Sequence, residues 1–583
     1  MRSYRSIFLC VISAALLVHS FPEPNFWVLA WFALIPLFLA IRDKTFINAF
    51  LLGFFAGLIF FYGAIYWLNS IAPIATIALV FYLSLYFALF GLFAKFVFQA
   101  ALPVFCKALL VASGWVALEF IRSNFLTGFG WALLGYSQSS FLPAIQIADI
   151  TGAYGVSFLV VFVNAAIYEF LFESSPRVPL TPGPLPTWER ERVRGLYFTT
   201  TRLMQNRLIN FICSFLLVTG IFIYGFYKLN KEIASSPFAS LRAPRNDGCV
   251  PIKISLIQGN IPQPLKWDAS YKEDIIKKYF RLTLAAGKDD PDLIIWPESS
   301  FPAYFQAEPE LAGQLFELAR QTNVYLLVGA NRFVWSRPGY EYEKVYNSAF
   351  LITPDGAIKQ YYDKLHLVPF GEYMPRVPNP LLKILPEKIN MVGDFSAGEK
   401  YTVFGLRLPL TQSSFASLRT SFSPQGRGIK GEGVRNDTAA TFSVLICFED
   451  VFPELSREFV RKGANFLVNI TNDGWYGISS APFQHAQASV FRAVENRVFV
   501  VRAANTGLSV FIDRNGRVFD GVSSESGQKI FIEGYKTGVI SQSLSSSATT
   551  FYNRYCDVFA IACLVVFAIS IGFSRTQLGK SKV

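Results

Sequence analysis

The chemistry that this sequence could perform is easiest to see at Cys447. An apolar run, 444–446, leads to this cysteine, and Phe448, Glu449 and Asp450 follow it. A free thiol is mostly protonated near neutral pH, so it becomes a useful nucleophile only where a base takes its proton or a cation stabilises the thiolate. The rest of the chain must therefore supply that base or cation.

Two other segments offer candidates. Glu298 comes directly after the apolar run 293–297, whose final proline ends strand pairing and helps to fix where the carboxylate points. Lys364 lies in a loop that is rich in aromatic residues and that carries a second carboxylate, Glu372. Taken singly, each would be an ordinary surface residue. The hypothesis is that Glu298 is the base, Lys364 the cation and Cys447 the nucleophile.

A cysteine–histidine dyad is the alternative. The chain has three histidines, of which His19 lies in an apolar run, whereas His366 and His485 lie in the more polar middle of the chain. Either of the latter two could serve Cys447 as a base. The seven cysteines include no CxxC pair and no metal-ligand spacing, so we expect no disulfide framework, no metal and no cofactor.

The composition divides the chain into membrane and globular parts. Hydrophobic residues make up 52% of the chain and charged residues only 16%, whereas roughly a quarter of a typical soluble protein is charged. The apolar excess lies in 1–230 and 551–574, which we predict to be a membrane domain of about seven helices and a C-terminal membrane helix. Much of the excess positive charge behind the net charge of +12 lies beside apolar runs or in arginine-rich inserts, and with no nucleic-acid motif we expect no nucleic-acid partner.

Apolar runs predict a multi-span α-helical membrane bundle of about eight helices. Crossing a bilayer as a helix takes about 20 apolar residues. The candidate spans are 6–21, 24–41, 47–69, 74–98, 103–120, 150–172, 208–228 and 551–574. A signal peptide is the alternative for the first. A transporter or a receptor with an external ligand domain is a further alternative, but the predicted spans show no intramembrane charge pair of the kind that often marks transport.

The distribution of lysine and arginine predicts the orientation. Basic residues precede the first span, follow the second, flank the turn after the fourth, fill 177–207 and end the chain. Cytoplasmic loops carry such an excess, so we expect all of these to lie on one side of the membrane, in the cytoplasm. The globular domain between the seventh and eighth spans is then expected outside, in a periplasm-like space.

Three segments resemble insertions. They are the basic insert 176–207, the stretch 236–247 and a stretch at about 411–438. The last two share a short repeat, SFASLR and SPFASLR. Because 176–194 is rich in proline and arginine, we expect it to be disordered or extended. We assign no function to these inserts.

The remaining middle, 250–545, predicts an α/β domain. Apolar strands are expected at 252–258, 293–297, 325–330, 442–446, 466–470, 497–502 and 509–513. Helical periodicity is expected at 269–286, 308–321 and 484–495. Alternating strands and helices favour a sheet covered by helices, with active groups gathered where the strands end.

The Glu, Lys and Cys segments, in that chain order, resemble the nitrilase superfamily. Together with the flanking spans, the whole chain resembles the apolipoprotein N-acyltransferase family. The supporting motifs are QGNIPQ (258–263) with Lys266 and Trp267, HLVPFGE (366–372), NDGWYG (472–477), RAANTG (502–507), TGFGW (127–131) and LGYSQ (134–138). The resemblance implies an extracytoplasmic, nitrilase-like αββα sandwich domain over 250–545.

The resemblance also implies a ping-pong reaction, the last step of lipoprotein maturation. A phospholipid acyl donor passes a fatty acyl chain to Cys447 as a thioester, and the N-terminal amine of a diacylated apolipoprotein acceptor then takes it. The implied roles are Glu298 as general base and acid, and Lys364 as the group that stabilises the oxyanion with the backbone N–H of Phe448. Glu372 would orient Lys364 or relay protons.

Substrate-binding residues are implied as well, namely Trp267, Phe448, Glu449, Trp475, Gly128 and Trp131. Phe448 stands where the family commonly has tyrosine, and Gly130 where proline is common. The alternative function is that of a membrane-tethered nitrilase or amidase that hydrolyses a small-molecule C–N bond. Eight spans argue against it, because one anchor would suffice.

Overall fold

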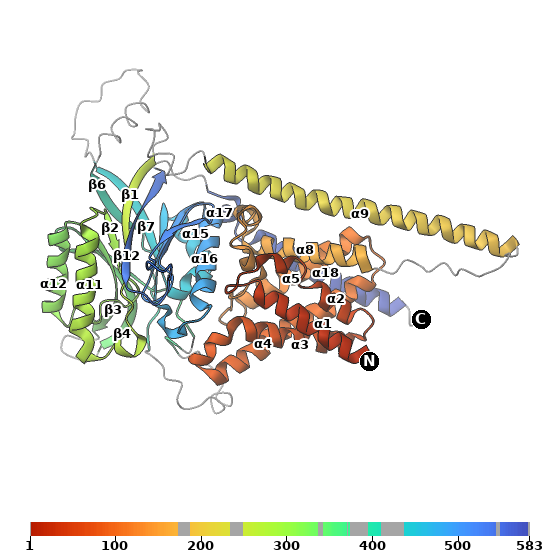
Figure 1. Cartoon of the computed structure of the whole chain (residues 1–583), viewed down its shortest axis with the longest axis horizontal. Helices are drawn as coiled ribbons and strands as arrows, with labels where there is room; N and C mark the ends of the chain where they lie inside the picture. Colours follow the sequence, from red (N-terminus) through yellow and green to blue (C-terminus); the bar gives the residue numbers. More distant parts are fainter. Residues whose placement is uncertain are drawn as a thin grey trace, which may run out of the picture. The chain divides into compact units, whose positions relative to one another are not determined.

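The computed structural model describes residues 2–172, 187–233, 249–335, 342–369, 371–373, 394–409, 437–543 and 549–580 (Figure 1). The chain forms two compact units. The first comprises Met1–Tyr66, Ala75–Tyr227 and Asp557–Val583, and the second comprises Trp67–Ile74 and Lys228–Cys556. The predicted insert 236–247 lies outside the described residues, as does the insert at about 411–438 up to residue 436.

The first unit is helical and apolar. Its helices are α1 (Arg2–His19), α2 (Ile35–Ile41), α3 (Phe46–Ile65), α4 (Pro73–Gln99), α5 (Val104–Asn124), α6 (Leu142–Ile145), α7 (Ala148–Thr151), α8 (Ala153–Phe172), most of α9 (Thr187–Ile233) and α18 (Val558–Lys580). Among the described residues, five helices are long and apolar enough to cross a membrane: Phe46–Ser70, Pro73–Gln99, Val104–Asn124, Ala153–Phe172 and Leu208–Lys231. The other three predicted spans correspond to the shorter apolar helices Tyr4–His19, Trp27–Ile41 and Val558–Gly572.

The prediction of a disordered or extended segment at 176–194 is wrong in its second half. Helix α9 already begins at Thr187, directly after the last proline of the segment. Glutamate, arginine, leucine and methionine are favourable helix formers, and the helix meets no further proline before it ends. Residues 176–186 lie outside the described part of the chain.

Buried charged groups connect helix ends within the first unit. Lys107, near the start of α5, forms an ion pair of 3.1 Å with Glu169, near the end of α8. Lys95, near the end of α4, donates to the backbone oxygen of Arg42, just after α2, at 3.1 Å. The expectation that the spans carry no charge pair is therefore wrong, although this pair joins two helix ends. These contacts gather the ends of α2, α4, α5 and α8 on one side of the unit.

The second unit contains two six-stranded sheets that lie face to face between layers of helices (Figure 1). The first sheet has the order β12 (Gly534–Ser543), β1 (Cys249–Gln258), β2 (Leu293–Ile295), β3 (Tyr325–Trp335), β4 (Tyr342–Ile352), β5 (Ile358–Asp363). The second has the order β11 (Val518–Gly521), β10 (Val510–Ile512), β9 (Phe499–Ala504), β8 (Phe466–Thr471), β7 (Asp437–Ile446), β6 (Phe404–Pro409). Helices α11 (Lys272–Gly287) and α12 (Pro309–Thr322) cover the first sheet, and α15 (Pro453–Arg461) and α16 (Ala481–Asn496) cover the second.

Parallel pairing places the chemistry at one end of each sheet. In the first sheet β1, β2 and β3 run parallel, and in the second β7, β8 and β9 do so. Because central parallel strands are covered on both faces, they consist of nearly continuous apolar residues. Glu298 follows β2, Cys447 follows β7 and Asn472 follows β8, so three polar side chains come from the carboxyl ends of parallel strands.

Candidate active site

Cys447 occupies a strained elbow at the end of β7. Its φ is +54°, in the left-handed region that residues with a Cβ rarely adopt. Two side chains hold its backbone carbonyl: Asn469 Nδ2 donates at 3.1 Å and His485 Nε2 at 3.2 Å. Surrounding hydrogen bonds of this kind can maintain a strained conformation that a functional side chain requires.

Trp296 and Asn347 position Glu298. Trp296 is fully buried two residues before it, stacked on Tyr279 of α11 at 4.7 Å between ring centroids. Asn347 Nδ2 donates to Glu298 Oε1 at 2.7 Å, and the backbone N–H of Asn472 donates to Oε2 at 2.8 Å. The carboxylate is therefore held from both sheets of the second unit.

Lys364 brings its ammonium to the same place. It follows β5 and is only 1% exposed, and its Nζ lies 2.8 Å from Glu372 Oε1 and 3.8 Å from Glu298 Oε1. Burial alone would lower the pKa of Lys364, but the two carboxylates outweigh burial and raise that pKa well above its ordinary value. The side chain is therefore a permanent cation at any working pH.

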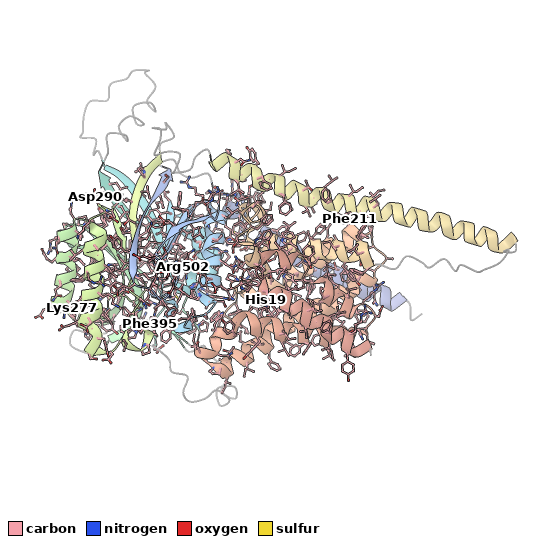
Figure 2. All side chains as sticks on the ribbon, in the orientation of Figure 1. His19, Phe211, Lys277, Asp290, Phe395 and Arg502 are labelled. Carbon is pink, nitrogen blue, oxygen red and sulfur yellow. The ribbon has the colours of Figure 1, made fainter. Side chains whose placement is uncertain are left out.

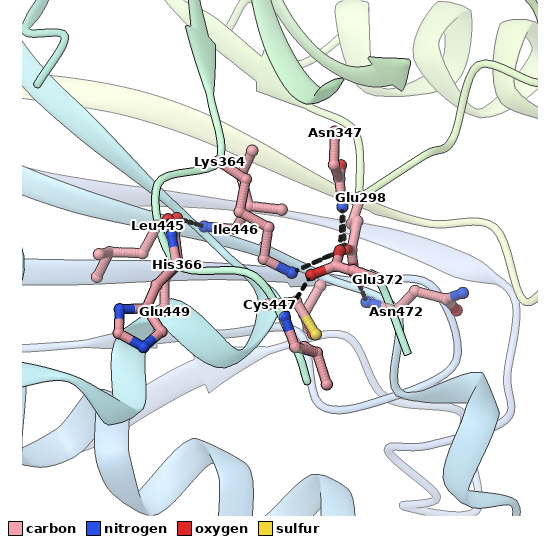
Figure 3. A network of polar contacts seen from close by, with 12 residues as sticks. Glu298, Asn347, Lys364, His366, Glu372, Leu445, Ile446, Cys447, Glu449 and Asn472 are labelled. Carbon is pink, nitrogen blue, oxygen red and sulfur yellow. Dashed lines mark hydrogen bonds and ion pairs between the residues drawn. The ribbon is translucent and has the colours of Figure 1, made fainter. Parts of the chain in front are cut away.

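Glu372 is held as firmly as its partner. Its Oε1 also accepts a hydrogen bond from Asn347 Nδ2 at 3.0 Å, and its Oε2 accepts one from the backbone N–H of Val368 at 2.8 Å. In Figure 3 the ammonium of Lys364, both carboxylates and the sulfur of Cys447 meet in one place. The three predicted catalytic side chains and Glu372 thus lie together.

The thiol is protonated at rest. Burial raises the pKa of Cys447, the carboxylate of Glu298 raises it further, and Lys364 lowers it without reversing the sum. A thiol with a raised pKa needs a base at the moment of attack. Glu298 is the carboxylate that the site offers for this purpose.

Neither histidine of the dyad alternative takes that role in this arrangement. His485 is fully buried, with Nδ1 2.8 Å from Asp473 Oδ1 and Nε2 3.0 Å from Asp450 Oδ1. The ring therefore links these carboxylates to the carbonyl of Cys447. His366 stacks on Phe452 at 3.6 Å between ring centroids. The geometry favours Glu298 as the base.

Comparisons with known proteins decide the family. Residues 13–166 match the family described as "Apolipoprotein N-acyltransferase N-terminal domain", and residues 253–533 match the family described as "Carbon-nitrogen hydrolase". An apolipoprotein N-acyltransferase from Geobacter metallireducens is 37% identical over 98% of this chain and 96% of its own length. The chain belongs to the apolipoprotein N-acyltransferase family. A relative named apolipoprotein N-acyltransferase 2 from Treponema denticola is 26% identical over 81% of this chain and 78% of its own length. An amidase of the nitrilase superfamily from Nesterenkonia is similar at 17% identity, covering 54% of this chain and 98% of that chain with a TM-score of 0.34.

The contacts of Glu449 show a structural role beside the substrate-binding role that was predicted for it. The side chain is fully buried. Its oxygens accept four hydrogen bonds, from the Tyr362 hydroxyl (2.8 Å) and the backbone N–H groups of Leu365 (2.7 Å), His366 (3.0 Å) and Ile446 (2.7 Å). Glu449 therefore ties the loop that carries Lys364 to the strand that carries Cys447 (Figure 3).

The remaining predicted substrate residues lie in different parts of the chain. Trp267 is 45% exposed, Trp475 and Phe448 are half-buried, and all three belong to the second unit. Gly128 and Trp131 belong to the first unit, where Arg122 donates to the backbone oxygen of buried Trp131 at 2.7 Å (Nη1).

Sequence reasoning missed several residues that build the site. Asn347 was not singled out because it lies in β4, a strand that was not predicted. Asn472 was recognised only as part of a family motif, and Lys266 only as the neighbour of Trp267. Nothing in the local sequence marks a buried lysine, because lysine is among the residues most often exposed. The signal that could have pointed to Lys266 is its place in a motif, with Trp267, that resembles the apolipoprotein N-acyltransferase family.

Proposed function

We propose that this chain is an apolipoprotein N-acyltransferase that carries a fatty acyl chain on Cys447 from a phospholipid to the N-terminal amine of a diacylated apolipoprotein. The observation that carries the proposal is the meeting of a buried carboxylate, a buried ammonium and a protonated thiol, with Glu298 Oε1 3.8 Å from the Nζ of Lys364. This set suits acyl transfer through a thioester.

In the first half-reaction Glu298 takes the proton of the Cys447 thiol as the sulfur attacks the phospholipid ester carbonyl. The oxyanion that forms is stabilised by the ammonium of Lys364 and by the backbone N–H of Phe448. As the carbon–oxygen bond breaks, Glu298 returns the proton to the leaving glycerol oxygen. A lysophospholipid departs, and the acyl chain remains on Cys447 as a thioester.

In the second half-reaction the apolipoprotein amine attacks the thioester carbonyl. Glu298 takes a proton from the attacking nitrogen, and the same two donors stabilise the second oxyanion. The carbon–sulfur bond then breaks, and the proton passes to the departing thiolate. The products are an amide on the apolipoprotein and the restored Cys447 thiol.

Membrane location makes physical sense of this chemistry. Withdrawing an acyl chain from the bilayer costs about 0.8 kcal/mol for each CH₂ group. We place the chain in a bacterial inner membrane with eight crossings, in which the shorter helices Tyr4–His19, Trp27–Ile41 and Val558–Gly572 complete the five longer ones. In this arrangement 1–230 and 551–574 lie in the membrane, and the catalytic domain 250–545 lies on the periplasmic side.

The test is direct detection of the acyl-enzyme. The membrane-embedded protein is incubated with phospholipid and no acceptor, and the peptide that contains Cys447 is weighed. We expect a mass increase of one acyl chain that disappears when a diacylated lipopeptide is added. Cys447→Ala should show no adduct. If no adduct forms on Cys447, or if a small amide is hydrolysed while phospholipid is ignored, the proposal is wrong and the amidase alternative gains.

A further inference from the structure

A second lysine lies against the base. Lys266 is 2% exposed, and its Nζ donates a hydrogen bond of 2.8 Å to the backbone oxygen of Glu298. The next residue, Trp267, is 45% exposed. One short segment therefore presents an aromatic ring to the exterior and an ammonium to the backbone of the base.

The segment is also joined to the carboxylate of the base. Gln263, in the short turn η4 (Gln263–Leu265), accepts a hydrogen bond from Asn472 Nδ2 at 2.6 Å. The backbone N–H of Asn472 donates to Glu298 Oε2 at 2.8 Å. The loop 260–267 is thus connected to Glu298 at two points, its backbone carbonyl and, through Asn472, its carboxylate.

Asn505 anchors the beginning of this loop. Its Oδ1 accepts from the backbone N–H of Ile261 at 2.9 Å, and its Nδ2 donates to the Ile261 oxygen at 2.8 Å. The same Nδ2 donates to Asn472 Oδ1 at 3.0 Å. Because the start of the loop is fixed, the conformation of its second half depends on Lys266 and Gln263.

Lys266 also adds positive charge to the site. Glu298 and Cys447 both act on its ammonium electrostatically, while Lys364 pairs with Glu372 and Glu298. Burial lowers the pKa of Lys266 to about 8, although Glu298 and Cys447 oppose the change. Removing this cation would take positive charge away from the site, which disfavours both a thiolate and an oxyanion.

We propose that Lys266 is a positioning residue that holds the backbone of Glu298 and couples the Trp267-bearing loop to the catalytic base. This inference rests on the proposed function, because it takes Glu298 to be the base. Lys266 does not itself touch the reacting atoms. Its loss should slow the chemical step and leave phospholipid binding largely unchanged.

The test compares Lys266→Met with the control Lys277→Met, whose lysine side chain is 71% exposed on α11. Two rates are measured at Cys447 by peptide mass: acylation by phospholipid, and alkylation by iodoacetamide. We expect kcat for acylation to fall by about 100-fold, the size of effect that a misplaced catalytic group produces. KM should stay within about twofold, alkylation should slow as well, and the control should match wild type.

Further variants keep the idea open to refutation. Lys266→Arg retains a cation and a donor, so it should recover part of the rate that Lys266→Met loses. If Lys266→Met does not fold, Lys266→Arg and Gln263→Leu are compared with wild type instead. Both of these variants should lower kcat and leave KM unchanged. Wild-type kcat and alkylation in folded Lys266→Met, or a loss that appears only in KM, would overturn the inference. The proposed function fails separately, because in that case the wild-type protein itself forms no acyl-Cys447.

Discussion

At the scale of single residues, the site separates the roles of two similar carboxylates by distance. Lys364 lies 2.8 Å from Glu372 but 3.8 Å from Glu298, so the ammonium is paired mainly with the former. Asn347 Nδ2 donates to both carboxylates and so links them through one amide. A base that is not tightly paired with an ammonium remains able to accept a proton, and this is the condition that Glu298 meets.

Changing Glu372 to Gln should therefore disable the base indirectly. The neutral amide no longer holds the ammonium, and Lys364 is then free to pair with Glu298. We expect acylation of Cys447 to slow by about 100-fold, the lower end of the range typical of general acid–base catalysis, as measured by single-turnover mass spectrometry. The matched control is Glu317→Gln, because Glu317 is 68% exposed on α12. An unchanged acylation rate in Glu372→Gln would rule out this division of roles.

Phe448 provides a second prediction at this scale. The proposed oxyanion contact uses its backbone N–H, and the ring packs edge-on against Phe452 at 5.1 Å. Phe448→Tyr keeps both the backbone and the ring. Acylation and transfer rates should therefore remain within about twofold of wild type, since a surplus hydroxyl adds no donor to the oxyanion. A change of tenfold or more would assign the hydroxyl a part in the reaction.

At the scale of secondary-structure elements, the sequence predicted the centre of each sheet and missed the edges. The strands β1, β2 and β3, and β7 to β10, coincide with predicted apolar runs, whereas β4, β5, β6, β11 and β12 were not predicted. Central strands are covered on both faces and are apolar throughout, but strands nearer an edge alternate with polar residues. Strand β5, IKQYYD, lies at an edge and has a single buried residue, Tyr362, so no apolar run marks it.

The same physics limited the prediction of the site. Glu298 and Cys447 were found because each follows a buried apolar strand. Asn347 lies within unpredicted β4, and its bond to Glu298 joins residues 49 positions apart. Contacts of this length are set by how strands pair, and pairing is not visible in a single strand's composition.

The network beneath Cys447 gives an element-scale prediction about pH. Burial and Arg502 lower the pKa of His485, but Asp450 and Asp473 outweigh them and raise it from 6.5 to about 9. Because the pKa of His485 is higher in the folded than in the unfolded protein, protonation of this ring stabilises the fold. The stabilisation is complete below pH 6.5 and disappears as the pH rises through about 9. The difference between the two pKa values corresponds to about 3 kcal/mol of folding free energy at most.

His485→Gln should lose this pH dependence. The variant should unfold at a lower temperature than wild type at pH 6, and the two curves should converge between pH 6.5 and about 9. Thermal unfolding in detergent, followed by intrinsic fluorescence, measures this difference directly. Lys266 and other groups titrate in both proteins and cancel in the comparison. Parallel curves across this range would mean that His485 is not charged in the folded protein.

At the scale of the whole molecule, the two units differ in where they carry charged and apolar side chains. Figure 2 labels Lys277 and Asp290 on the outer helix layer of the second unit, and Arg502 in its interior, where it pairs with two aspartates at 3.1 Å each. The helices of the first unit instead carry exposed large apolar residues such as Ile47 and Leu216. Such surfaces are expected where the surrounding solvent is lipid, so membrane topology is the property to test at this scale.

Whether two residues lie on the same side of the membrane depends on whether the number of crossings between them is even or odd. Between Asp43, just after α2, and Asp290, just after α11, the described chain has five helices long enough to cross a membrane. Five is an odd number, so if all five cross, these residues lie on opposite sides whether or not the three shorter helices cross. The lysines and arginines around Asp43 predict that it lies in the cytoplasm. Asp290→Cys should therefore react with a membrane-impermeant maleimide in intact spheroplasts, and Asp43→Cys only after lysis, each read from its own labelled peptide. Labelling of both positions in intact spheroplasts would mean an even number of crossings, and the reverse pattern would place the acyl-transfer site in the cytoplasm.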